Sequence, residues 1–175
     1  MVGLKCVFLV SLVASALVVG NAESDTLDSL LRRVLNQMHA RAVQDAQEYV
    51  QRLMTAASAS DGTSSIERLS VLDMTSGKLL ASGGQGAVPL SDDDKAKIAG
   101  AVKNGRYQMF ESAGLKVDSK TYRLFMSTAS QAVVRFGNRS GTILVKKTGV
   151  GALIVRVPAG KLNQATIKAL ADTSK

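Results

Sequence analysis

The apolar positions between residues 132 and 157 fall into three short runs separated by turn residues. The runs are Ala132–Phe136, Thr142–Lys147 and Ala152–Val157, and the separators are residues 137–141 and 148–151. Short apolar runs rich in β-branched residues and bounded by glycine predict consecutive β-strands. The apolar residues are nearly continuous within each run, so both faces of the sheet should be covered. We therefore expect helices to flank it.

Two other segments have the three- and four-residue spacing of helices. The first runs from Glu23 to Ala57 and contains a one-residue slip. Its simpler interpretation is a helix packed on the sheet; the alternative is that residues 25–42 extend beyond the domain and pair with another chain. The second helix should begin after Ser91, which stands in capping-box spacing with Asp94, and end at Gly105.

The remaining pattern adds strands and a final helix. Strands are predicted at Ile66–Met74, Leu79–Ser82 and Thr121–Ser127, a possible short strand at Tyr107–Leu115, and an amphipathic helix at Leu162–Ala171. Within the last of the clear strands, Phe125 is expected to point into the core. Together these elements predict one α+β domain. Its central antiparallel sheet should have about six or seven strands, with helices on both faces.

The N-terminus has the pattern of a secretory signal peptide. Lys5 precedes the apolar stretch Cys6–Val19, and the small residues at 20–22 predict cleavage after Ala22. An uncleaved anchor helix is the alternative, but the apolar stretch is short for the ~30 Å hydrocarbon core of a bilayer. The expected division is therefore a signal peptide at 1–22, a helical extension at 23–45 and a domain at 46–175.

Cleavage would have two consequences for the chemistry of the mature chain. The single cysteine, Cys6, would leave with the leader, so no disulfide is expected. In the secretory pathway, Asn138 in the triplet Asn-Arg-Ser would become a candidate glycosylation site.

The charge is strongly basic and unevenly distributed. The formal net charge is +8, and nine basic residues with no acidic residue lie between Ser119 and Ala171. Such a segment predicts an acidic partner, either a protein surface or an anionic lipid headgroup. The few aromatic residues nearby disfavour a nucleic-acid stacking platform. The candidate binding residues are Arg123, Arg135, Arg139, Lys146, Lys147 and Arg156.

Catalysis has little support in the sequence. The one histidine, His39, has no carboxylate at triad-like or metal-ligand spacing. Loss of the only cysteine would also remove the commonest metal-binding and nucleophilic arrangements. We expect no enzyme activity, no metal site and no cofactor.

The segment from Ala46 to Lys175 resembles the profilin family. The resemblance rests on Arg135, the hairpin at 137–141, the Lys-Lys-Thr-Gly turn at 146–149 and the helix that carries Tyr49. It implies binding of monomeric actin through the later strands and affinity for phosphoinositides through basic residues. Roadblock and longin domains share the broad element order and are the alternative at the level of the fold, with Leu72–Ala81 as the stretch that fits them.

The third activity implied by the resemblance, binding of proline-rich segments, depends on clustered aromatic rings. Here Tyr49 remains, whereas Ala46, Leu80 and Thr173 stand where rings are expected. Because each missing ring removes a large apolar contact, this activity should be weak or lost. The leader also conflicts with a cytosolic actin partner. The first hypothesis is therefore a diverged actin-binding profilin, cytoplasmic if the leader is not used. The second is a secreted profilin-fold module with another acidic partner.

Overall fold

The structure is a computed structural model that describes residues 24–58, 64–137, 141–160 and 170. The chain divides into two compact units, Met1–Ala40 and Arg41–Lys175. Helix α2 (Ser24–Ala57) contains the boundary between them. Among the described residues, no helix combines the length and the apolar character needed to cross a membrane.

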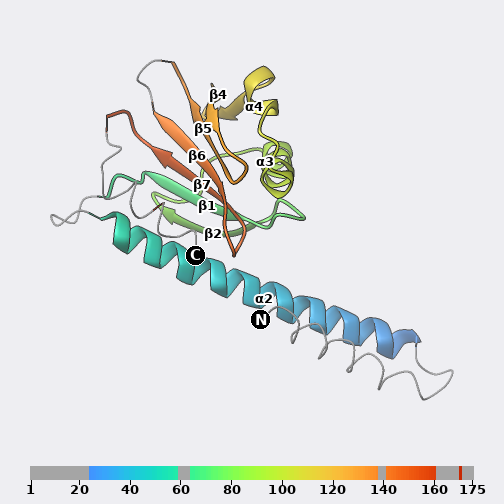
Figure 1. Cartoon of the computed structure of the whole chain (residues 1–175). Helices are drawn as coiled ribbons and strands as arrows, with labels where there is room; N and C mark the ends of the chain where they lie inside the picture. The colour runs from blue at the N-terminus through green and yellow to red at the C-terminus, as the bar shows by residue number, and fades with distance from the viewer. Residues whose placement is uncertain (1–23, 59–63, 138–140, 161–169, 171–175) are drawn as a thin grey trace. The chain divides into compact units, whose positions relative to one another are not determined.

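Within the described part of the second unit, seven strands form one sheet in the order β2-β1-β7-β6-β5-β4-β3, and every neighbouring pair is antiparallel (Figure 1). The strands are β1 (Arg68–Leu72), β2 (Leu79–Gly84), β3 (Leu115–Val117), β4 (Lys120–Ser127), β5 (Gln131–Arg135), β6 (Thr142–Lys147) and β7 (Ala152–Val157). The predicted bounds of β6 and β7 are confirmed, and so is the predicted sheet with helices on both faces.

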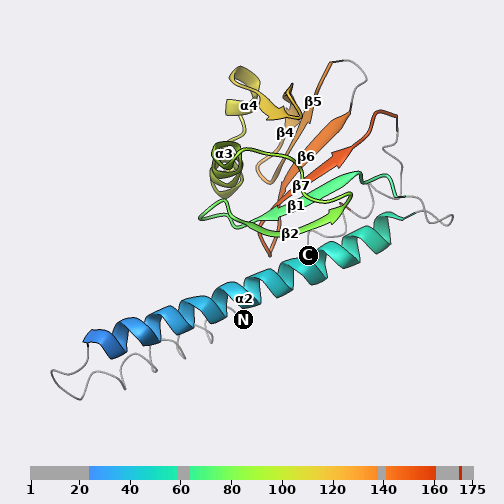
Figure 2. The ribbon, with the colours of Figure 1, turned by 180° about the vertical axis from the view of Figure 1, so that it is seen from behind.

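Two core clusters lie on opposite faces of the sheet because strand residues alternate in direction. On β7, Ile154 packs in the first cluster with residues of α3 (Asp92–Asn104) and α4 (Met109–Ser112). Figure 2 shows these two helices on the same side of the sheet. Leu153 and Val155 pack in the second cluster with the C-terminal part of α2. Both faces of β7 are therefore buried.

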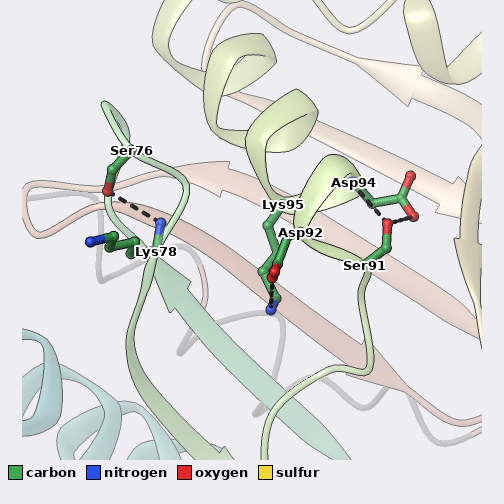
Figure 3. Close-up of polar contacts among 6 residues, drawn as sticks. All are labelled: Ser76, Lys78, Ser91, Asp92, Asp94 and Lys95. Atoms are coloured by element: carbon green, nitrogen blue, oxygen red, sulfur yellow. Dashed lines mark hydrogen bonds and ion pairs between the residues drawn. The ribbon is translucent and has the colours of Figure 1, made fainter.

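Local capping interactions fix the ends of α3. The Ser91 hydroxyl accepts a hydrogen bond from the Asp94 backbone N–H at 3.1 Å and donates one to the Asp94 carboxylate at 2.7 Å (Figure 3). Gly105 closes the helix in the left-handed conformation at φ 63°. Lys95 pairs with Asp92 at 2.8 Å. The predicted cap is confirmed, and the acidic residues of the first turn serve the helix itself.

The segment 107–115 differs from the possible strand that the sequence suggested. Residues Met109–Ser112 form α4, and the strand β3 begins only at Leu115. Tyr107 and Phe110 are both buried in the first core cluster, with ring centroids 6.3 Å apart. Their three-residue spacing brings both rings to one side of a helical turn, whereas in a strand they would point to opposite faces.

The predicted helix at 23–57 is confirmed as α2, but its packing changes along its length. Ala46, Leu53 and Ala57 are fully buried in the second core cluster. By contrast, the large apolar side chains from Leu27 to Met38 are exposed. The second half of α2 therefore packs on the sheet, as the simpler interpretation predicted. The predicted final helix at 162–171 lies outside the described residues apart from Leu170, which is buried.

Gly151, in the turn between β6 and β7, provides a test of backbone packing. Its φ is +153°, and an added Cβ would lie 2.4 Å from the carbonyl oxygen of Leu72. We expect Gly151→Ala to lower the free energy of unfolding by about 2–4 kcal/mol, because it combines steric overlap with a strained backbone. Denaturant titration followed by circular dichroism measures this change.

Gly149→Ala is the matched control, because an added Cβ at this position meets no atom within 4 Å. It should change the free energy of unfolding by less than about 0.5–1 kcal/mol. Equal losses in the two variants would show that close packing of this turn against β1 does not govern its stability.

Candidate functional site

The candidate site begins with two arginines on neighbouring strands. Arg123 of β4 and Arg135 of β5 are direct cross-strand partners, and both are exposed. Residues directly opposite one another in an antiparallel pair project to the same face, where like charges destabilise the sheet. The fold therefore places two like-charged side chains at directly opposed positions of the sheet, at a cost to stability.

A β-bulge beside these arginines exposes two large apolar residues. The register of β4 against β5 shifts between Leu124 and Met126, which leaves Phe125 as the extra residue. Phe125 is 58% exposed and Met126 is 53% exposed. The prediction that Phe125 points into the core is wrong because the bulge interrupts the alternation of the strand.

The phenyl ring of Phe125 also holds one of the two charges. The Arg135 guanidinium lies 3.8 Å from the ring centroid, a cation–π contact that orients it. The Arg123 guanidinium donates a hydrogen bond to the Glu111 backbone carbonyl at 3.2 Å. Within the described residues, neither arginine forms an ion pair, so both charges are available to a partner.

We refer to Arg123, Phe125, Met126 and Arg135 as the β4–β5 face. It borders a shallow hollow of about 410 Å³, whose lining includes Thr121, Leu124, Phe136 and Gly137. Exposed aromatic and arginine side chains around a hollow suit a protein partner, because these residue types are enriched in the buried centres of interfaces.

The adjacent lysines of β6 do not belong to this face. Lys146 is only 5% exposed and donates a hydrogen bond to the backbone carbonyl of Leu170. Burial lowers the pKa of its ammonium group. Lys147 is exposed but projects to the opposite face, since direction alternates along a strand. The expectation that Lys146 lies on an exposed binding surface is therefore wrong.

Arg156 forms ion pairs with two acidic residues that are distant in sequence. Its Nε lies 3.3 Å from Oε2 of Glu67, and its Nη1 donates to the Asp118 carboxylate. Burial works against the charged guanidinium, but the hydrogen bond to Asp118 and the nearby negative charges raise the pKa of Arg156 overall. Because these acids offset its charge, Arg156 serves the fold and is not part of a free basic patch.

The other sequence-predicted residues lie elsewhere. Tyr49 is 8% exposed and shares the second core cluster with Ala46 and Leu80, so its ring is not presented to solvent. Asn138, Arg139 and Thr173 lie outside the described residues. The prediction of an exposed glycan acceptor at Asn138 and of a role for Arg139 stays a prediction.

Catalytic chemistry gains no new candidate. Among the described residues, no three His, Cys, Asp or Glu side chains gather closely enough to hold a metal ion. His39 is exposed on α2.

The sequence feature that best predicted the β4–β5 face was the basic segment after Ser119. Phe125 and Met126 were missed because nothing in the local pattern marks the bulge.

Comparison by sequence found no matching family model and no matching curated protein. Comparison by structure found profilins. Schizosaccharomyces pombe profilin superposes with a TM-score of 0.56 at 15% identity, covering 73% of this chain and 92% of that chain. Acanthamoeba castellanii profilin II superposes with a TM-score of 0.53 at 17% identity, covering 73% and 92%.

A third solved structure is the complex of LokiProfilin2 with rabbit actin. It superposes with a TM-score of 0.51 at 14% identity, covering 73% of this chain and 90% of that chain. At this level of identity the comparisons define the fold. The part of the chain that they cover is a diverged domain with the profilin fold, as its resemblance to that family predicted.

Proposed function

We propose that this protein binds monomeric actin through the β4–β5 face. The observation that carries the proposal is the cross-strand pair Arg123 and Arg135, which forms no ion pair within the described residues and whose Arg135 guanidinium lies on the exposed ring of Phe125. A sheet that keeps like charges together forgoes stability, which is expected where a surface is kept for a partner. LokiProfilin2, which shares the fold, was solved with rabbit actin and supports the choice of partner.

The composition of the face suggests how such a partner would be held. Two guanidinium groups can make bidentate hydrogen bonds with carboxylates of an acidic surface. Phe125 and Met126 would bury apolar area between and beside these ionic contacts. Phosphoinositide headgroups would engage the same two guanidinium groups through their phosphates, so the two ligands would compete.

Binding of proline-rich segments is proposed to be weak or absent. Tyr49, Ala46 and Leu80 all pack within the second core cluster. A proline-rich helix needs exposed rings to form its groove. The buried Tyr49 ring and the missing aromatic side chains at positions 46 and 80 both argue against such a groove.

A second candidate function comes from the N-terminal leader pattern. If residues 1–22 direct secretion, the β4–β5 face would bind an acidic extracellular protein in place of actin. The shared requirement is negative charge on the partner, and the difference lies in the compartment. Processing of the natural chain therefore separates the two candidates.

The first prediction for the proposed function concerns a variant in which both arginines of the β4–β5 face are replaced by alanine. Arg123→Ala/Arg135→Ala should weaken binding of monomeric actin by roughly tenfold to a hundredfold, because two charged contacts in one interface are lost. The affinity of the parent should fall as salt is raised, and that of the variant should depend less on salt. Isothermal titration calorimetry with actin held monomeric measures both effects.

Lys103→Ala/Arg106→Ala is the matched control, since it removes the same charge from two exposed residues at the end of α3 and just after it. Its affinity should stay close to that of the parent. No binding by the parent, under conditions where LokiProfilin2 binds rabbit actin, would reject actin as the partner. Equal loss in both variants would reject the β4–β5 face.

The second prediction concerns a polyproline peptide. Titration of the protein should show no saturable binding in the concentration range where an ordinary profilin, measured alongside as the positive control, reaches saturation. The physical reason is the absence of an exposed aromatic groove around the buried Tyr49. Comparable affinities for the two proteins would show that other aromatic residues form the groove.

The third prediction concerns processing of the natural protein. Intact mass should correspond to a chain that begins at Glu23. Extra mass that an N-glycosidase removes would report a glycan, with Asn138 as the candidate acceptor. An unmodified chain that begins at Met1 would contradict secretion and favour the actin-binding candidate.

A further inference from the structure

The first half of α2 carries large apolar side chains that the described structure leaves exposed. The exposed fractions are 49% for Leu27, 49% for Leu30, 48% for Leu31, 63% for Leu35 and 56% for Met38. Single exposed leucines are ordinary on protein surfaces, but a continuous group of five on consecutive turns marks an interaction site.

These side chains form an ordered stripe along the helix. Leu27, Leu31, Val34 and Met38 are separated by four, three and four residues, which places them along one line on an α-helix. Leu30 and Leu35 widen the line on either side. This alternation of four and three is the spacing with which one helix packs its side chains between those of another. We refer to these six residues as the α2 stripe.

The order of the spacings indicates what covers the stripe. Four-three-four reads the same in both directions along the chain. If two identical helices lie antiparallel about a two-fold axis, Leu27 of each copy faces Met38 of the other, and Leu31 of each faces Val34. Every apolar position then meets an apolar position, which is the self-complementary contact that a two-fold dimer requires.

Charge distinguishes this arrangement from a parallel one. Arg41 follows Met38 by three residues, and Ser24 precedes Leu27 by three, so both extend the same line. A parallel pair would bring two Arg41 side chains together in the contact. An antiparallel pair sets each Arg41 opposite position 24 of the other copy, which is a serine. The acidic Asp28 does not add an attraction, because its carboxylate already pairs with Arg32 of the same helix at 2.8 Å. The antiparallel pair thus avoids the repulsion that a parallel pair would create.

We propose that two copies of this chain associate through an antiparallel contact between the α2 stripes, over residues 24–41. Six side chains that are only partly exposed provide less than the ~800 Å² per partner of a standard interface. The dimer should therefore be weak and depend on protein concentration. The contact uses none of the residues of the β4–β5 face, so it is independent of the proposed actin binding.

Sedimentation velocity of the full chain over a wide range of concentration tests the association. The parent should shift from monomer to dimer as concentration rises. Leu31→Lys/Met38→Lys should remain monomeric at concentrations where most of the parent is dimeric. Each apolar pair of the contact, Leu27 with Met38 and Leu31 with Val34, would then contain one charged side chain. Circular dichroism confirms that both proteins are equally folded.

Asn36→Lys/Ser29→Lys is the matched control. It adds the same charge to the same exposed helix but at positions away from the stripe. The dimerisation constant of this variant should stay within about threefold of the parent, since only a modest general repulsion is added.

Cross-linking tests the orientation of the two helices. In a background with Cys6→Ser, Leu31→Cys and Val34→Cys are made as separate single-cysteine chains. Under mild oxidation a mixture of the two should give a disulfide between the different chains, because Leu31 and Val34 face each other in the antiparallel pair. Efficient cross-linking of the Leu31→Cys chain with itself would overturn the antiparallel contact.

Three other results would overturn the proposal. The first is a full chain that stays monomeric at every concentration. The second is equal dissociation by the stripe variant and its control. The third is a dimer that disappears when residues 1–22 are removed from the folded chain, because the leader and not the stripe would then hold the copies together.

Discussion

Burial of β7 on both of its faces is the constraint from which the rest of the domain follows. Leu153 and Val155 require cover on one side of the sheet, and Ile154 requires it on the other. The C-terminal part of α2 meets the first need, and α3 with α4 meets the second. Side chains of β4 and β5 on the α2 side lie beyond this cover. The β4–β5 face is thus exposed because the C-terminal part of α2 covers β7 and does not extend over β4 and β5.

The elements that sequence predicted well are those with local signals. β6 and β7 are bounded by glycine turns, and α3 is bounded by Ser91 and Gly105, so neighbouring residues suffice to define them. The misassigned segment at 107–115 lacked such signals. Its helical turn is stabilised by burial of Tyr107 and Phe110 against elements that are remote in sequence, which a local pattern does not contain.

The candidate site was predicted in part, because charge is visible in a sequence and its neutralisation is not. Arg123 and Arg135 were recovered together with Arg156, which Glu67 and Asp118 neutralise from other parts of the fold. The basic segment after residue 119 is therefore less basic in space than in sequence. Phe125 shows the complementary error, since the bulge that exposes it comes from pairing with β5.

The contact between Lys146 and Leu170 gives two neighbouring amines very different access to solvent. Lys146 is buried with its ammonium group on the Leu170 carbonyl, whereas Lys147 is open. An amine-specific reagent must wait for the Leu170 contact to open before it reaches Lys146, but not before it reaches Lys147. The ratio of the acylation rates of Lys146 and Lys147 therefore reports how often the Leu170 contact opens. Both positions lie in one peptide, so Lys147 serves as the internal reference.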